Sequence, residues 1–476
     1  MSKRTKRIKK VKTARGGNIE YLDEVGEDQY GTYQRALLSM TRGGKGKPYN
    51  VYMEPSPHLV LDTSPSPRGW YKGKNESDRV RPRPCYTEAL LTTPYGGFCP
   101  LNCAHCYVNG GTRGYRATGL PAAHVVYPDK LRAQIAKINV SGAGYITSFS
   151  EPFHQLEPKY HVTRRLAQVF IDEGLPIFYL SRSIPPDWAI DTLQENAYSY
   201  MQWSINTGNP DHYRKMSPGS YDLDDVYERI QDFSEQGIFV SIQVNPIVAG
   251  ITKLADIMLL LDNLKQAGAH HCIFKFVEQV ANNRKSLMAR MGKRGLPDVD
   301  KFDKVFSQVI GGVYTVAQDV RVEWLKAILE HTRKLGLTMS TCYEYYNDGH
   351  AGSNLAPWFT TSDQCHGRGV PVYYRPSPGA PFQPVPGCYR KGCLYCSDYG
   401  TRACGNDKLL HADAMEYKDL RETVIREVDD ELWAHVDSCL MPEDAKQSTR
   451  NIIFYSNPKM LTDAEMWGWG EVDEIC

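Results

Sequence analysis

Between residues 88 and 280, short apolar runs alternate with longer segments whose apolar residues recur every three or four positions. A short apolar run bounded by polar residues is typical of a strand buried on both faces, and the longer spacing predicts an amphipathic helix. The predicted strands cover 88–92, 145–149, 177–181, 201–206, 239–245 and 271–277. The predicted helices cover 128–140, 159–173, 186–196, 222–236 and 253–267.

This alternation predicts an α/β fold built on a parallel sheet, because parallel neighbouring strands need a crossover connection that is usually a helix. We expect a partial (β/α)6 barrel of the TIM type, in which functional residues lie at the C-terminal ends of the strands. Helical spacing at 302–316 and 322–335, followed by a short strand at 339–344, is expected to continue the barrel.

The chain divides into six predicted segments. They are a basic disordered tail (1–15), an extension rich in Gly, Pro and basic residues (16–84), the barrel (85–280), a helical continuation that closes it (281–345), a cysteine-rich metal-binding region (346–410) and an acidic appendage (411–476). The tail has few apolar residues to bury, and the extension has little periodicity, which suits an extended arm.

Composition narrows the class of protein. The 476-residue chain has no run of 18 apolar residues and no apolar N-terminal segment of the kind that signal peptides have. We therefore expect a cytoplasmic protein without a membrane span. Its 13 cysteines then suit metal or redox chemistry better than disulfides.

Charge is distributed unevenly along the chain. The net charge is +1, but residues 1–15 hold eight Lys and Arg and no acidic residue, which leaves −7 on the remainder. Basic residues are also interleaved with Tyr and Trp between 43 and 84. Such stretches can bind nucleic-acid phosphates and stack on bases, or serve only as a solubilising terminus and an extended arm.

The most specific motif is C-x3-C-x2-C, formed by Cys99, Cys103 and Cys106 after the first predicted strand. Three thiolates on one loop can hold three irons of a cubane 4Fe-4S cluster and leave the fourth iron without a protein ligand. Zinc knuckles and disulfides also use closely spaced cysteines. Here no fourth ligand is nearby and no second C-x2-C follows at zinc-ribbon spacing, which favours the cluster.

Polar side chains follow the predicted strands at the points where the strands end. Because the C-terminal ends of parallel strands share one edge of a sheet, we expect these side chains to surround a ligand at the barrel mouth. Any one of them could instead cap a loop, but they recur at four successive strand ends. The predicted binding residues are Ser150, Glu151, Arg182, Ser183, Ser204, Asn206, Gln243 and Asn245.

The cysteine motif and its preceding strand resemble the radical SAM superfamily. Segments 147–157, 162–166, 179–183 and 243–247 further resemble the spore photoproduct lyase-like branch. The resemblance implies that S-adenosylmethionine (SAM) binds the open iron through its amine and carboxylate. It also implies that reductive cleavage of SAM yields a 5'-deoxyadenosyl radical, which abstracts hydrogen from the substrate.

The resemblance assigns roles to four of the predicted binding residues. It implies that Ser150 and Glu151 lie near the SAM amine and that Ser204 lies near the ribose. It places Arg182 at the SAM carboxylate, where the family has a lysine.

One departure from the family bears on the reaction. Spore photoproduct lyase returns a hydrogen atom from a cysteine where this chain has Ser148, and a serine O–H bond is too strong for that role. This argues against lesion repair by the same route. Other residues considered as hydrogen donors are Tyr107, Tyr179, Cys272 and Cys342.

A second compact set of cysteines lies near the C-terminus, where Cys388, Cys393 and Cys396 form C-x4-C-x2-C. The set could hold an auxiliary 4Fe-4S cluster or a structural zinc ion. We favour iron-sulfur, because auxiliary clusters are frequent in the radical SAM superfamily. The candidate fourth ligands are Cys365, Cys404 and Cys342.

Together these features predict a radical SAM enzyme whose substrate is a thymine or modified thymine in DNA that undergoes rearrangement or modification. A base in a duplex would have to be flipped into the barrel mouth. An external electron donor such as flavodoxin or ferredoxin would be a partner. The alternatives are a radical SAM maturase of a peptide or small molecule, and a non-enzymatic iron-sulfur protein that binds nucleic acid.

Overall fold

The computed structural model describes the central part of the chain and several shorter pieces. The described residues are 7–12, 17–39, 45–62, 68–69, 89–106, 108, 118–136, 138–147, 149–310, 313–342, 344–346, 353–354, 359–362, 366–371, 373–375, 379–384 and 415–416. Within these residues, no helix is long and apolar enough to cross a membrane.

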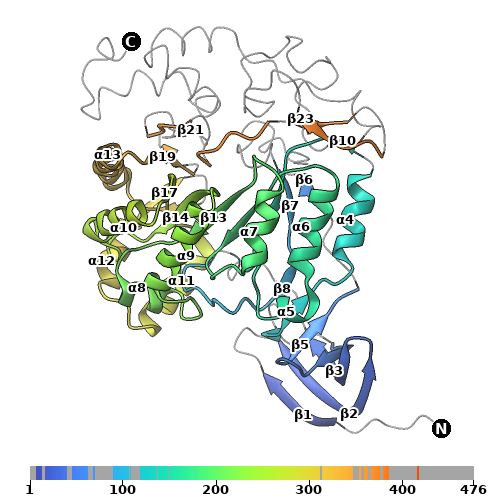
Figure 1. Ribbon diagram of the computed structural model, residues 1–476. Helices are drawn as coiled ribbons and strands as arrows, with labels where there is room; N and C mark the ends of the chain where they lie inside the picture. Colours follow the sequence, from blue (N-terminus) through green and yellow to red (C-terminus); the bar gives the residue numbers. More distant parts are fainter. Residues whose placement is uncertain are drawn as a thin grey trace, which may run out of the picture.

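An eight-stranded sheet forms the centre of the molecule (Figure 1). Its strands from β19 to β7 are all parallel, and the short β6 pairs antiparallel with β7. Across the sheet, the order is β19 (Thr338–Thr341), β15 (His271–Phe276), β14 (Phe239–Ile247), β13 (Tyr200–Ser204), β12 (Ile177–Ser181), β11 (Ala143–Ile146), β7 (Ala89–Thr92) and β6 (Arg68–Gly69).

This sheet confirms the predicted fold class, a partial α/β barrel. Its parallel strands are the six that the apolar runs predict and β19, which matches the predicted short strand and pairs with β15 from the His271–Thr338 position onward. Among the described residues, β19 and β6 form the two edges, so the sheet is open.

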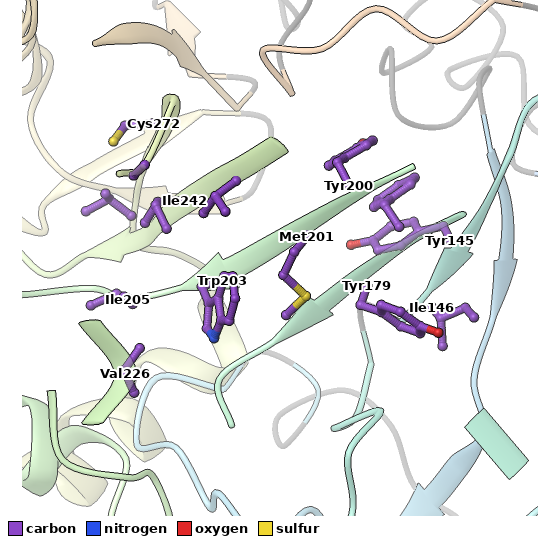
Figure 2. Close-up of a cluster of buried hydrophobic side chains, with 14 of the residues drawn as sticks. Tyr145, Ile146, Tyr179, Tyr200, Met201, Trp203, Ile205, Val226, Ile242 and Cys272 are labelled. Atoms are coloured by element: carbon purple, nitrogen blue, oxygen red, sulfur yellow. The ribbon is translucent and has the colours of Figure 1, made fainter. Parts of the chain in front are cut away.

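The strands are buried on both faces, which explains their nearly continuous apolar sequences. Successive side chains of a strand point to opposite faces. Figure 2 shows this for β13, where Tyr200 lies on one side of the strand and Met201 and Trp203 lie on the other. The outer side packs against helices, and the inner side faces the barrel interior.

Amphipathic helices connect and cover the strands, with α4, α6 and α7 side by side in Figure 1. Gly174 and Gly336 follow α6 and α13 with φ angles of 79° and 67°, a backbone conformation that favours glycine at helix ends. The helices are α4 (Tyr127–Ile135), α5 (Glu157–Tyr160), α6 (Val162–Asp172), α7 (Asp187–Gln194), α8 (Pro210–Met216), α9 (Leu223–Glu235), α10 (Leu254–Gln266), α11 (Ala281–Lys293), α12 (Val299–Val305) and α13 (Gln318–Leu335).

The N-terminal part differs from the expected disordered tail and extended arm, because it forms a second sheet. The strand β1 pairs antiparallel with β2, with Lys10 opposite Glu20 in the register. A small apolar cluster that includes Ala36 and Leu38 packs under this sheet. Its strands are β1 (Arg7–Lys12), β2 (Asn18–Asp28), β3 (Gly31–Ser39), β4 (Lys47–Tyr52), β5 (His58–Val60), β9 (Pro121–Ala123) and β8 (Tyr95–Gly97).

Two predicted helices are shorter than expected. The helix predicted at 302–316 stops at Val305 in α12, and β17 (Gln308–Ile310) and β18 (Val313–Thr315) then form a hairpin that β16 (Glu278–Val280) extends. The two residues between these strands are both glycine, which is typical of short hairpin loops. The helix predicted at 128–140 ends at Ile135, and β10 (Ile138–Ser141) follows it.

The C-terminal third is described only in short pieces. They comprise β20 (Tyr345–Tyr346), β21 (Ser353–Asn354), β22 (Tyr373–Tyr374), β23 (Gln383–Pro384) and β24 (Met415–Glu416). The predicted second metal site lies outside the described residues, with all of Cys365, Cys388, Cys393, Cys396 and Cys404. Tyr107 and Ser148 also lie outside them.

Candidate active site

The three cysteines of the C-x3-C-x2-C motif and the polar strand ends line one cavity of about 500 Å³. Cys103 is buried and Cys99 and Cys106 are half-buried, and all three thiols are free. Between the first two cysteines, Asn102 has a positive φ of 46°, a conformation that asparagine tolerates better than most residues. This turn brings the whole cysteine loop to the cavity wall.

The segment that follows α8 holds the cysteine loop in place. The Ala104 backbone N–H donates to the Met216 carbonyl at 2.8 Å. The Ser217 hydroxyl donates to the Cys103 sulfur at 3.1 Å. These contacts fix the middle of the loop, and a hydrogen bond to sulfur favours the thiolate over the thiol.

Gly219 lies against the same loop. A Cβ atom at this position would be 2.2 Å from the Pro100 carbonyl oxygen and 2.8 Å from its carbonyl carbon. Only a residue without a side chain allows the two backbones to approach this closely. The glycine is visible in the sequence, but nothing local to it indicates which loop it contacts.

Two arginines reach the cysteine loop from the region of α11. Arg290 Nε donates to the Ala104 carbonyl at 2.8 Å. Arg294 donates to the Asn102 carbonyl and, at 3.3 Å, to the Met216 carbonyl. Sequence reasoning missed both residues, because they lie almost 200 positions from the loop that they bind.

Glu151 follows β11 and is 1% exposed at the cavity wall. Its Oε1 accepts a hydrogen bond from the Ser181 hydroxyl at 2.6 Å, and its Oε2 accepts one from the Arg182 backbone N–H at 3.1 Å. Burial raises the pKa of Glu151 to about 7, although these hydrogen bonds favour the ionised form. A cationic ligand group at this carboxylate would restore its ordinary ionisation.

Arg182 crosses from the end of β12 to β14. Its Nη2 donates to the Asn245 carbonyl at 2.8 Å, and the Ser204 hydroxyl donates to the same carbonyl at 3.2 Å. Among the described residues, Arg182 Nη1 and Ser150 Oγ are buried without a hydrogen-bond partner. Buried donors without partners are costly, so both atoms suit an anionic ligand group such as a carboxylate.

A lysine-glutamate ion pair also lines the cavity, at the end of β15. Lys275 Nζ donates to Glu278 Oε2 at 3.0 Å, and the two side chains are 8% and 25% exposed. Sequence reasoning missed this pair, because Lys275 lies within an apolar run and Glu278 lies after it. The cavity therefore carries the separate charges of Glu151 and Arg182 and, in addition, the ion pair of Lys275 and Glu278.

A stack of aromatic rings crosses the inner face of the sheet. Tyr145, Phe178 and Tyr200 occupy matching positions on β11, β12 and β13, with ring centroids 4.3 Å and 4.6 Å apart. His366 Nδ1 lies 2.6 Å from the Tyr200 hydroxyl, and both His366 and Tyr145 line the cavity. Figure 2 shows Tyr145 and Tyr200 close together at this layer. Burial lowers the pKa of His366 to about 4, so this imidazole is neutral at pH 7.

Comparison with known proteins assigns this site to a family. The sequence profile of the radical SAM superfamily matches residues 93–268. A protein named radical SAM Nalpha-GlyT isomerase, from Pseudomonas phage M6, is 39% identical over 427 residues, which are 86% of this chain and 89% of that protein. The chain belongs to the radical SAM superfamily. It is therefore an enzyme, and its family implies SAM, a 4Fe-4S cluster and a source of electrons.

Solved structures resemble this radical SAM enzyme less closely. Spore photoproduct lyase complexed with dinucleoside spore photoproduct is 15% identical with a TM-score of 0.40, over 52% of this chain and 74% of that chain. Streptococcus suis SuiB bound to SAM is 13% identical with a TM-score of 0.36, over 58% of this chain and 54% of that chain.

The residues of this radical SAM enzyme fit a cluster at the cysteine loop. Burial raises the pKa of Cys99 and of Cys103, so the apo protein favours neutral thiols there. Bound iron would supply the positive charge that keeps these sulfurs ionised. In the described part of the chain, no group of three metal-ligating side chains surrounds a single ion position. A cubane does not need one, because each thiolate binds a different iron.

The structure brings most of the predicted SAM-binding residues to the cavity wall. Ser183 and Asn206 do not line it: the Ser183 carbonyl accepts from Trp203 Nε1 at 3.1 Å, and Asn206 Nδ2 lies 2.7 Å from Met216 Sδ. The predicted binding residues that line the cavity are Ser150, Glu151, Arg182, Ser204, Gln243 and Asn245.

The structure places the residues considered as hydrogen donors in different surroundings. Cys342 lines the cavity from the end of β19, next to the strand that carries Lys275. Cys272 is buried away from the cavity, and the Tyr179 hydroxyl lies 2.8 Å from that of Thr192. Of these described residues, Cys342 is the one that lines the cavity.

Proposed function

We propose that this radical SAM enzyme is an isomerase that acts on a thymine base bearing a glycine-type substituent. The observation that carries the proposal is the 39% identity, over 86% of the chain, to the phage protein named Nalpha-GlyT isomerase. We read that name as a glycine joined to thymine through its α-nitrogen. The basic and aromatic N-terminal sequence supports a substrate base in DNA.

The proposed roles of the site residues follow from their contacts. Cys99, Cys103 and Cys106 hold the cluster, which together with SAM supplies a 5'-deoxyadenosyl radical when both are bound. Arg182 Nη1 is the donor for the SAM carboxylate, because it is buried and has no hydrogen-bond partner among the described residues. The buried Glu151 carboxylate accepts from the SAM ammonium.

Three further residues complete the proposed SAM site. We assign Ser204 to the ribose. Its hydroxyl lies on the cavity wall at the end of β13, where it donates to the Asn245 carbonyl. Gln243 and Asn245 line the same wall from β14 and offer amide groups to the nucleoside. A ligand that fills this space excludes water from the reacting atoms.

An isomerisation sets a strict condition on the products. It conserves every atom, so the hydrogen atom that is taken from the substrate has to be replaced, and product and substrate have the same mass. The replacement can come from 5'-deoxyadenosine, which regenerates SAM. Alternatively it can come from a protein thiol such as Cys342, whose thiyl radical then takes one electron from the external electron donor and a proton, so that SAM is consumed. Deuterium placed on the substrate carbon distinguishes the two routes, because the first one carries deuterium into SAM and the second leaves it in 5'-deoxyadenosine.

The test is an anaerobic assay of the reconstituted enzyme with SAM and dithionite. The substrate is a DNA oligonucleotide with one N-linked glycyl thymine, and digested nucleosides are analysed by liquid chromatography and mass spectrometry. We expect a SAM-dependent nucleoside of unchanged mass and altered retention. Cleavage of SAM without an isobaric nucleoside would show that the substrate assignment is wrong.

Matched cysteine variants control for the cluster. Cys103→Ala removes a proposed cluster ligand and should abolish both SAM cleavage and product. Cys272→Ala removes a buried thiol that does not line the cavity, and it should retain both. Equal activity of the two variants would contradict the assigned ligand.

We further propose an auxiliary 4Fe-4S cluster in the C-terminal region, with zinc as the alternative. Its basis is the sequence spacing of Cys388, Cys393 and Cys396, with Cys365 or Cys404 as the fourth ligand. Flavodoxin or ferredoxin is the proposed electron donor to the enzyme.

A further inference from the structure

The cavity carries more charged groups than SAM can use. SAM has one α-amino acid group, which contains one ammonium and one carboxylate. In the proposed function, Glu151 and Arg182 bind this group beside the cysteine loop, close enough that their charges act on the pKa of Cys99 and Cys103, respectively. The pair of Lys275 and Glu278 lines the same cavity and takes no part in that binding.

The second pair comes from a different strand. The Glu151 carboxylate is held at the end of β12 by the Ser181 hydroxyl and the Arg182 backbone N–H, and the Arg182 guanidinium reaches β14 at the Asn245 carbonyl. Lys275 lies on β15, the next strand of the sheet. An amino acid group whose ammonium lies at Glu151 and whose carboxylate lies at Arg182 is therefore held between β12 and β14, and Lys275 and Glu278 are not needed to bind it.

Burial makes the second pair costly in the absence of a ligand. Lys275 and Glu278 are mostly removed from water, and the desolvation of two charges can exceed their mutual attraction. Cys342 and Ile273 line the same cavity as the pair. A ligand with its own carboxylate and amine would give both charges further hydrogen bonds.

We propose that Lys275 and Glu278 form the subsite for the glycine-type substituent of the substrate. Lys275 donates to the free carboxylate, and Glu278 accepts from the α-nitrogen. This inference rests on the proposed function, which supplies a substrate with these two groups. It assigns substrate specificity to Lys275 and Glu278 and SAM binding to the residues that follow or end β11 to β14.

The competing explanation is that the pair only fixes the turn between β15 and β16. The chain offers a matched control for this explanation. Lys301 and Asp298 form another lysine-acid pair three residues apart, at 2.9 Å, with side chains 70% and 29% exposed. Neither residue lines the cavity. Loss of a surface pair of this kind should leave substrate binding unchanged.

The first experiment needs no variant. Labelled oligonucleotides with either N-linked glycyl thymine or its neutral glycinamide analogue are titrated against the reconstituted enzyme with SAM, and binding is measured by fluorescence anisotropy. We expect the carboxylate form to bind about tenfold tighter or more, as for a charge-assisted hydrogen bond. Equal affinity for the two oligonucleotides would overturn the subsite.

The second experiment assigns the preference to Lys275. Lys275→Met should remove the preference for the carboxylate, and Lys275→Arg should keep most of it, while Lys301→Met should behave as the wild type. Iron content and SAM affinity serve as checks of folding for each variant. If Lys275→Met is folded and retains the full preference, the inference is wrong.

The two proposals fail in distinguishable ways. If the wild type isomerises the glycyl thymine but Lys275→Met shows no change in preference, only the subsite is wrong. If the wild type neither binds this oligonucleotide more tightly than an unmodified one nor converts it, the proposed function is wrong. If Lys275→Met does not fold, the glycinamide comparison on the wild type decides the question alone.

Discussion

Gly219→Ala tests whether the segment after α8 determines the geometry of the cysteine loop. The added Cβ would lie 2.2 Å from the Pro100 carbonyl oxygen, and ordinary contacts begin near 3.4 Å, so one of the two backbones has to move by about 1 Å. Overpacking of this kind costs about 1–3 kcal/mol. Because the neighbouring atoms belong to the backbone and not to a flexible side chain, we expect the cysteine loop itself to shift.

The matched control is Gly292→Ala. A Cβ at Gly292 has no atom within 4 Å, and this glycine lies within α11, where alanine is the better helix former by about 1 kcal/mol. This substitution should leave iron binding unchanged and leave the thermal midpoint equal or slightly higher.

The assay combines two measurements on each protein. Iron and sulfide per chain are quantified after anaerobic reconstitution, and the thermal midpoint is measured on the apo protein. Gly219→Ala should lose most of its cluster at Cys99, Cys103 and Cys106 and unfold at a lower temperature. Full iron content together with an unchanged midpoint would refute the claim that this contact positions the loop.

Three other predictions follow from the site. Arg182→Met should weaken SAM binding about tenfold or more in calorimetry, because it removes a charge-assisted donor, and Arg182→Lys should recover part of the loss; unchanged affinity would contradict the assigned role. Cys99→Ala and Cys393→Ala should each lose about four irons in anaerobic analysis, and zinc retained by the second cysteine set in the wild type would rule out its iron-sulfur assignment. Burial lowers the pKa of His366 to about 4, from about 6.5 in the unfolded chain. The free energy of unfolding should therefore fall as the pH is lowered from about 6.5 toward 4, by about 3 kcal/mol in total, because only the unfolded chain takes up the proton in this range. His366→Gln should flatten this part of the pH profile in urea unfolding, and an unchanged profile would show that other groups cause it.

The charged side chains of the cavity fall into two sets. Glu151 and Arg182 act on the pKa of the cysteine loop, and Lys275 and Glu278 come from β15 and β16. If the first set binds SAM and the second binds the substrate, as proposed above, Arg182→Met should weaken SAM binding and Lys275→Met should weaken substrate binding.

The sequence by itself determined those features that depend on neighbouring residues. The spacing of Cys99, Cys103 and Cys106 defines the metal site, because a short loop keeps three thiols close together in any fold. Alternation of apolar runs and helical segments predicted the parallel sheet, and topology then placed Ser150, Glu151 and Arg182 at one edge. The helix predicted at 302–316 was wrong in its second half, because a regular apolar spacing over one or two turns also fits a hairpin.

Only the tertiary structure decided which distant residues complete the site. Arg290 and Arg294 reach a loop almost 200 residues earlier, and His366 pairs with Tyr200 across 166 positions. Lys275 appears in the sequence as one charge within an apolar strand, and only packing places it in the same cavity as the cysteines. Contacts between residues this far apart in the sequence depend on how whole elements pack against each other, so local periodicity cannot predict them.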